Sequence, residues 1–124
     1  MTCLFCDKIN HIHDLLYEND TVVAFYDQYP VSKGHVLIVP KRHIQTYFDA
    51  TIAEKKDIDQ AIMTLKNRLD LSHQPDGYNI GINNGIASGQ SILHLHVHLI
   101  PRYVGDTIDP KGGVRGVIPG KQSY

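Results

Sequence analysis

The chain has 124 residues, of which 42% are hydrophobic and 20% charged, values typical of one globular domain that can bury a core. Its formal net charge of -1 leaves no basic excess, which argues against a nucleic-acid partner bound through its phosphates. No apolar run approaches the roughly 18 residues of a membrane span, and no secretory signal begins the sequence, so we expect a cytoplasmic protein without a membrane partner.

The first third of the sequence predicts a short helix and three strands. Asn19 and Asp20 form a turn between two runs rich in strand-forming residues, which indicates a hairpin. Pro40 ends the third run, after a loop punctuated by Pro30 and Gly34. The predicted helix lies near residues 3–10, and the strands cover 14–18, 21–26 and 35–40.

One long helix follows. Thr51 and Glu54 have the spacing of a capping box, in which each side chain bonds the other residue's backbone N–H. Pro75 and Gly77 lie beyond its end. Between these two ends, apolar residues recur at helical spacing and predict a face packed on a sheet: Ile58, Ala61, Ile62, Leu65 and Leu69.

The last part predicts two more strands, at 78–83 and 93–101, joined by a glycine-bearing loop at 84–89. Residues 107–124 are rich in glycine and proline and predict an irregular tail. Several strands around one long helix indicate an α+β fold, an antiparallel sheet with the helix on one face. With no repeat and no linker, we expect a single domain over 1–124.

The most informative segment is Leu93-His-Leu-His-Val-His-Leu-Ile100. Because alternate side chains of a strand share a face, the pattern predicts an aliphatic face of Leu93, Leu95, Val97 and Leu99. His94, His96 and His98 would then line the other face. A single histidine is more often structural, but three in strict alternation indicate a functional row.

Such a row suits either metal binding or phosphate chemistry. Neutral imidazole is abundant at pH 7 and can attack phosphorus, whereas protonated imidazole can stabilise a phosphate or a leaving oxygen. Just before the row, Ser88-Gly-Gln-Ser91 offers hydroxyls, an amide and backbone N–H groups for phosphate oxygens. A loop of this composition is usually an ordinary turn, but its place beside the histidines indicates function.

His94-Leu-His-Val-His-Leu-Ile100 resembles the signature of the histidine triad (HIT) family, His-φ-His-φ-His-φ-φ with φ apolar. Gly34-His-Val-Leu-Ile-Val-Pro-Lys41, Asp27 and the stretch from Asn84 to Ser91 strengthen the resemblance, which extends from residue 3 to about 106. It implies a five-stranded antiparallel sheet with one long and one short helix on one side. It also implies a homodimer that joins two sheets into one of ten strands.

The resemblance implies a two-step reaction on a purine nucleotide, with adenosine expected. His96 would attack the α-phosphorus and carry the nucleotide until water releases it. His98 would contact the phosphate and the departing oxygen, and His35 would support His96. Gln90 is included among the catalytic residues, and Asp27 would bind the ribose hydroxyls. The expected nucleotide-binding set is Asp27, Asn83, Gly89, Gln90, Ser91 and His98.

Cys3-x-x-Cys6 adds a candidate metal site. A thioredoxin-like redox motif would need a strand before it, for which position 3 leaves no room. With His43 and His94, two thiolates and two imidazoles suit a tetrahedral structural Zn²⁺, although the spacings are not those of a zinc finger. The resemblance supports this set, which occurs in one subset of HIT-like proteins; two free thiols are the alternative.

Several functions stay open at this stage. Pro101-Arg-Tyr-Val-Gly-Asp106 resembles the branch of the family that hydrolyses dinucleoside polyphosphates, which we favour. Hydrolysis of adenosine phosphoramidates is second and phosphorolysis third. Other classes are a nucleotide-sensing module without catalysis and a metal carrier that uses the histidine row.

Overall fold

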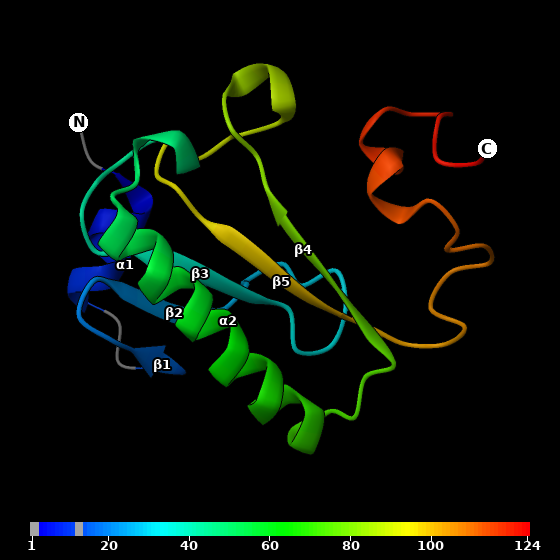
Figure 1. The fold of residues 1–124 in the computed structure, drawn as a ribbon, viewed down its shortest axis with the longest axis horizontal. Helices are drawn as coiled ribbons and strands as arrows, with labels where there is room; N and C mark the ends of the chain where they lie inside the picture. Colours follow the sequence, from blue (N-terminus) through cyan, green and yellow to red (C-terminus); the bar gives the residue numbers. More distant parts are fainter. Residues whose placement is uncertain (1–2, 12–13) are drawn as a thin grey trace.

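The computed structural model describes residues 3–11 and 14–124, and its centre is a five-stranded antiparallel sheet in the order β1-β2-β3-β5-β4 (Figure 1). Each neighbouring pair is antiparallel, as predicted. The five strands are β1 (Tyr17–Glu18), β2 (Val22–Tyr26), β3 (Val36–Pro40), β4 (Gly77–Ile82) and β5 (Val97–Arg102).

Helix α2 (Ile52–Ser72) lies across one face of the sheet (Figure 1). Its first turn is closed by the predicted capping box: the Glu54 backbone N–H donates to Thr51 Oγ1, and the Thr51 N–H donates to a Glu54 carboxylate oxygen. Four residues of the predicted apolar stripe are buried, and Ile62 is partly buried. They pack on one face of the central strands, which contributes Val22, Ala24, Val36, Ile38, Val97 and Leu99.

Helix α1 (Leu4–His11) covers the opposite face, so the expectation of both helices on one side is wrong. Phe5 is buried against the alternate residues of the same two strands, Val23 and Phe25 of β2 and Leu37 and Val39 of β3. Because β2 and β3 are buried on both faces, they are nearly continuous apolar runs, and α1 completes the second face.

Two predicted strands are shorter in the structure. β1 begins at Tyr17 instead of residue 14, and β5 begins at Val97 instead of residue 93. Before Val97 the chain leaves the sheet and follows the segment after β3, where the Leu95 N–H donates to the carbonyl oxygen of Ile44 (2.7 Å). Leu95 is still buried, but Leu93 is 41% exposed, so its predicted place on the core face is wrong.

The chain after β5 has one regular element, the short 3-10 turn Gly113–Val117, and it returns beside β4 (Figure 1). Two other 3-10 turns, Tyr47–Asp49 and Ile86–Ser88, lie in the loops before α2 and after β4. Among the described residues, no helix has the length and apolar character that crossing a membrane requires.

Candidate active site and metal centre

The three histidines of the row divide between two sites. His94 is fully buried and lies among cysteines and another histidine, whereas His96 and His98 line a cavity. The imidazole rings of His96 and His98 are 5.1 Å apart between centroids. The prediction of three imidazoles on one strand face is therefore only partly correct. The departure of the chain from the sheet before Val97 turns His94 towards α1.

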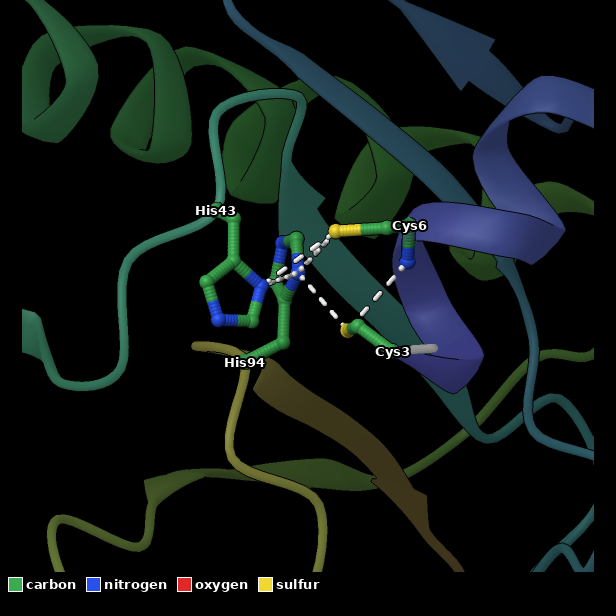
Figure 2. Close-up of side chains that lie close together, drawn as sticks. All are labelled: Cys3, Cys6, His43 and His94. Atoms are coloured by element: carbon green, nitrogen blue, oxygen red, sulfur yellow. Dashed lines mark hydrogen bonds between the residues drawn. The ribbon is translucent and has the colours of Figure 1, made fainter. Parts of the chain in front are cut away.

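The metal-site cluster comprises Cys3, Cys6, His43 and His94, whose side chains converge in Figure 2. The Cys6 Sγ atom is 3.2 Å from His43 Nδ1 and 3.4 Å from His94 Nδ1. The Cys3 Sγ atom is also 3.4 Å from His94 Nδ1. All four potential ligand atoms lie within 4.8 Å of one another, so the predicted set is brought together from three separate segments and can hold a metal ion.

The donor chemistry of this cluster fits a cation. His94 Nε2 is 2.8 Å from the carbonyl oxygen of Pro40, which can only accept, so the ring proton lies on Nε2 and Nδ1 keeps its lone pair. Burial lowers the pKa of His94, which keeps the ring neutral. Burial and the adjacent Cys3 raise the pKa of Cys6, and a bound cation would reverse this by stabilising the thiolates.

The same argument identifies the free nitrogen of His96. Its Nδ1 is 2.9 Å from the carbonyl oxygen of His94, so Nδ1 carries the proton and donates it, and Nε2 is left with a lone pair. The His96 and Phe5 rings pack in a T-shaped arrangement, with 5.0 Å between ring centroids. His96 is 92% buried and lines the cavity.

His35 contacts His98, and not His96 as predicted. The Val31 backbone N–H donates to His35 Nδ1 (3.2 Å), so a neutral His35 carries its proton on Nε2. That nitrogen is 2.9 Å from His98 Nδ1 and donates to it, which leaves the proton of a neutral His98 on Nε2. The difference from the prediction arises because the side chain of residue 35 meets β5 beside Leu37, whose pairing partner is His98.

Asp27 lies beside this pair, with a carboxylate oxygen 3.5 Å from His35 Nε2. Asp27, His35 and His98 have the residue types of a second metal cluster. However, the Val31 N–H occupies the nitrogen of His35 that would have to carry the proton if Nε2 bound a metal. The hydrogen bonds therefore favour a chain of proton donors over a metal site.

A cavity of about 290 Å³ opens in front of His96 and His98. Five of the six residues predicted to bind nucleotide line it: Asp27, Asn83, Gly89, Ser91 and His98. Helix α1 contributes further walls that the sequence analysis did not identify, Leu4, Phe5 and Lys8. Phe5 stands inside the Cys-x-x-Cys motif, and this position was the one available signal that it lies near the histidines.

Gln90 differs from its predicted role. Its side chain is buried and makes three bonds to backbone groups: it accepts from the Gly85 N–H and donates to the carbonyl oxygens of Gln45 and Ile92. All of these bonds are between 2.7 and 3.1 Å long. The side chain therefore holds the loop that carries Ser91 and does not face the cavity.

Comparison with known proteins places this geometry in a family. A family model described as the HIT domain matches residues 9–105. An uncharacterized HIT-like protein of Methanocaldococcus jannaschii is 40% identical and covers 84% of this chain and 81% of its own. A crystal structure of a HIT family protein from Bacillus anthracis has a TM-score of 0.79 at 36% identity, covering 85% of this chain and 76% of that one.

Three further relatives carry informative descriptions. A zinc-bound histidine triad protein from Mycobacterium smegmatis has a TM-score of 0.78 at 28% identity, covering 88% of this chain and 81% of that one. A protein of Arabidopsis thaliana named adenylylsulfatase HINT3 is 33% identical, over 86% of this chain and 55% of its own. An asymmetrical bis(5'-nucleosyl)-tetraphosphatase of Schizosaccharomyces pombe is 32% identical, over 83% of this chain and 57% of its own.

The electrostatics of His98 yield a testable pH dependence. Burial, together with the neighbouring His96 and His35, lowers the pKa of His98 to about 4. A depressed pKa means that the unfolded chain binds the proton first, so stability is lost as the pH falls from about 6.5 through about 4. NMR titration of the imidazole, assigned with a His98→Asn variant, should give a midpoint near 4.

Urea denaturation across the same pH range should show a smaller loss of stability in His98→Asn than in the wild type. A His98 midpoint at or above 6.5, the ordinary value, would contradict the buried arrangement described for this ring.

Proposed function

This chain belongs to the HIT domain family, and we propose that it hydrolyses nucleotides at the α-phosphorus through a covalent intermediate on His96. The observation that carries the proposal is the tautomer of His96. Its Nδ1 proton is committed to the carbonyl oxygen of His94, so the lone pair of Nε2 is available for attack. A neighbouring cavity lined by Asp27, Asn83 and Ser91 offers polar groups for a ribose and a phosphate.

In the first step, His96 Nε2 forms a bond to phosphorus and the bond from phosphorus to the leaving oxygen breaks. The Nε2–H of His98 donates a hydrogen bond to that oxygen, which departs as an anion. The phosphorylated ring of His96 becomes positively charged, and its Nδ1–H bond to the His94 carbonyl oxygen stabilises this charge. Water then attacks phosphorus, the P–N bond breaks, its electron pair returns to Nε2, and one proton passes to solvent.

Dinucleoside polyphosphates are the substrates we favour, cleaved to a nucleoside monophosphate and the remainder. The named tetraphosphatase of Schizosaccharomyces pombe supports this choice. The Pro-Arg-x-x-Gly-Asp segment supports it too, through its resemblance to that branch of the family; in the structure Arg102 and Asp106 form a two-bond ion pair. Adenosine phosphoramidates are the second candidate. The relative named adenylylsulfatase HINT3 supports this choice, because its name describes an adenylyl substrate whose leaving group is smaller than a nucleotide.

The nucleophile is tested by His96→Gly. This variant lacks the nitrogen that bonds phosphorus, so its turnover should fall by roughly three orders of magnitude or more. Its circular dichroism and its affinity for AMP should stay near those of the wild type. Wild-type protein quenched during turnover should show a nucleotidyl adduct on His96 by mass spectrometry. His11→Ala, an exposed histidine of α1, is the matched control. Full activity of His96→Gly would end the proposal.

We also propose that the metal-site cluster holds a structural Zn²⁺ ion. Two thiols and two imidazoles fill all four positions of a tetrahedral site, so no position is left for substrate. The zinc-bound relative from Mycobacterium smegmatis supports this identity. The ion would fasten α1, through Cys3 and Cys6, to the segment that carries His94, and it would take no part in the chemical steps.

Protein purified without chelators or metal-affinity resin should contain about one zinc per chain by elemental analysis. Cys6→Ser should lose most of this metal and should unfold at a lower temperature, since metal binding to a folded site adds stability. His11→Ala should keep the metal. Protein that lacks metal yet retains the wild-type unfolding temperature would refute the assignment.

A homodimer is the assembly we propose. β4 is an edge strand of the sheet, and edge strands present unpaired backbone groups that a second copy can bond. Ile80 in this strand is half exposed, which adds apolar surface at the same edge. Light scattering should give twice the mass of one chain, and Ile80→Lys should shift the population towards monomer. A wild type that stays monomeric at high concentration would exclude this dimer.

A further inference from the structure

A lysine of α1 lines the cavity in front of His96 and His98. It is Lys8, in the last turn of the helix, and its side chain is half-buried. We propose that its ammonium group recognises the base of the bound nucleotide, and that it selects purines with a carbonyl group at position 6, guanine and hypoxanthine, over adenine. The inference rests on the proposed function and extends it to the class of nucleoside that the site takes.

The register of the sheet gives the distance between Lys8 and the histidine of β5. Phe25 of β2 is paired with Leu37 of β3, and Leu37 is paired with His98 of β5. Residues paired in this way share a face and lie about 5 Å apart, so about 10 Å separates Phe25 from His98. The Lys8 Nζ atom lies above the Phe25 ring, 4.4 Å from its centroid. Lys8 therefore stands two strands away from His98 along the cavity, at the distance of a base and not of a phosphate.

The apolar walls beside Lys8 suit a flat ring. Phe5, Leu37 and Ile92 line the cavity, and all three pack in the same cluster as Phe25. A phosphate bound at the histidines is therefore followed, in the direction of Lys8, by apolar surface that a purine can cover. Small-molecule sites commonly combine such walls with a few polar groups that fix the orientation of the ligand. Lys8 is placed to do this for the base.

The ammonium group of Lys8 is not engaged by the acids around it. Asp7, the adjacent residue, faces His11 at 3.5 Å, and Asp27, the acid of the cavity, lies 3.5 Å from His35. Within residues 3–11 and 14–124, Lys8 forms neither an ion pair nor a hydrogen bond. Its N–H donors are therefore open to a ligand.

The chemistry of an ammonium group decides which purine it favours. An ammonium group donates three hydrogen bonds and accepts none. Guanine and hypoxanthine present two adjacent acceptors, O6 and N7, whereas adenine presents the N6 amino group, a donor, beside N7. A contact of this kind discriminates between bases by roughly tenfold or more. The preferred nucleoside is then guanosine or inosine, in place of the adenosine that the family resemblance implies.

The Lys8 end of the cavity is separate from the proposed dimer interface. The strand order places β3 and β5 between the strand of Phe25 and the β4 edge. A second copy paired along β4 therefore leaves this end open. Helix α1 is held in place by the buried side chain of Phe5 and by its cysteines, which meet the two histidines of the metal-site cluster (Figure 2).

The test compares the binding of IMP, GMP and AMP by calorimetry. The wild type should bind IMP and GMP about tenfold more tightly than AMP. Lys8→Met keeps an apolar contact with the Phe25 ring but removes the donors, so the preference should fall below about twofold. Lys8→Glu replaces the donor with an acceptor and should bind AMP at least as tightly as IMP.

Lys55→Met is the matched control. The Lys55 Nζ atom lies 4.9 Å from the centroid of the Tyr47 ring, in the same kind of contact, but Lys55 does not line the cavity. This variant should bind all three nucleotides as the wild type does. Equal affinity of the wild type for IMP and AMP, or a preference for IMP that persists in Lys8→Met and Lys8→Glu, would overturn the inference.

These measurements need no turnover, which separates the inference from the proposed reaction. If the wild type hydrolyses no nucleotide but prefers IMP and GMP through Lys8, the reaction is wrong and the inference stands. If the wild type is active but binds IMP and AMP alike, the reaction stands and the inference is wrong. Binding of none of the three nucleotides would also overturn the inference.

Discussion

Two backbone carbonyl groups determine what the central histidines can do. The carbonyl oxygen of Pro40 accepts the proton of His94, and the carbonyl oxygen of His94 accepts the proton of His96. An imidazole that donates from one nitrogen offers a lone pair at the other. The lone pair of His94 Nδ1 therefore faces the cysteines, and the lone pair of His96 Nε2 is left free. Both bonds exist because the chain leaves the sheet before Val97 and runs beside the end of β3.

This arrangement links the metal-site cluster to His96 through adjacent residues. His94 contributes a nitrogen to the cluster and a carbonyl oxygen to His96. Phe5, between the two cysteines, contacts both rings, with centroid distances of 6.1 Å to His94 and 5.0 Å to His96. An isolated helix as short as α1 is marginal in water, so its packing and its cysteine contacts must hold it in place. Whatever fastens α1 therefore also fixes one wall of the cavity in front of His96 and His98.

Local patterns were sufficient to predict much of this structure. The capping box and the apolar stripe of α2 depend on residues three to eight positions apart, and both were confirmed. The alternation of Leu95, Val97 and Leu99 predicted a buried face correctly even though β5 begins only at Val97. The four members of the metal-site cluster were predicted from the Cys-x-x-Cys spacing, the chemistry of two thiols with two imidazoles, and the family resemblance, and the structure brings them together.

The errors arise where side-chain direction depends on distant segments. Whether His35 meets His96 or His98 is decided by the register of β3 against β5, which residue types near position 35 do not encode. The path of the chain before β5 likewise decided that Leu93 is exposed, since it depends on the segment around Ile44.

Gln90 illustrates a more general constraint on polar loops. A loop that approaches a phosphate must present some polar groups to the ligand, but its own buried backbone groups must also be satisfied. Here the amide of Gln90 bonds Gly85, Gln45 and Ile92, while Asn83 and Ser91 line the cavity. A glutamine can donate and accept at once, which a serine of this loop cannot do across the same distance. Gln90, which the sequence suggested as a phosphate ligand, is therefore needed to satisfy the backbone groups of its own loop.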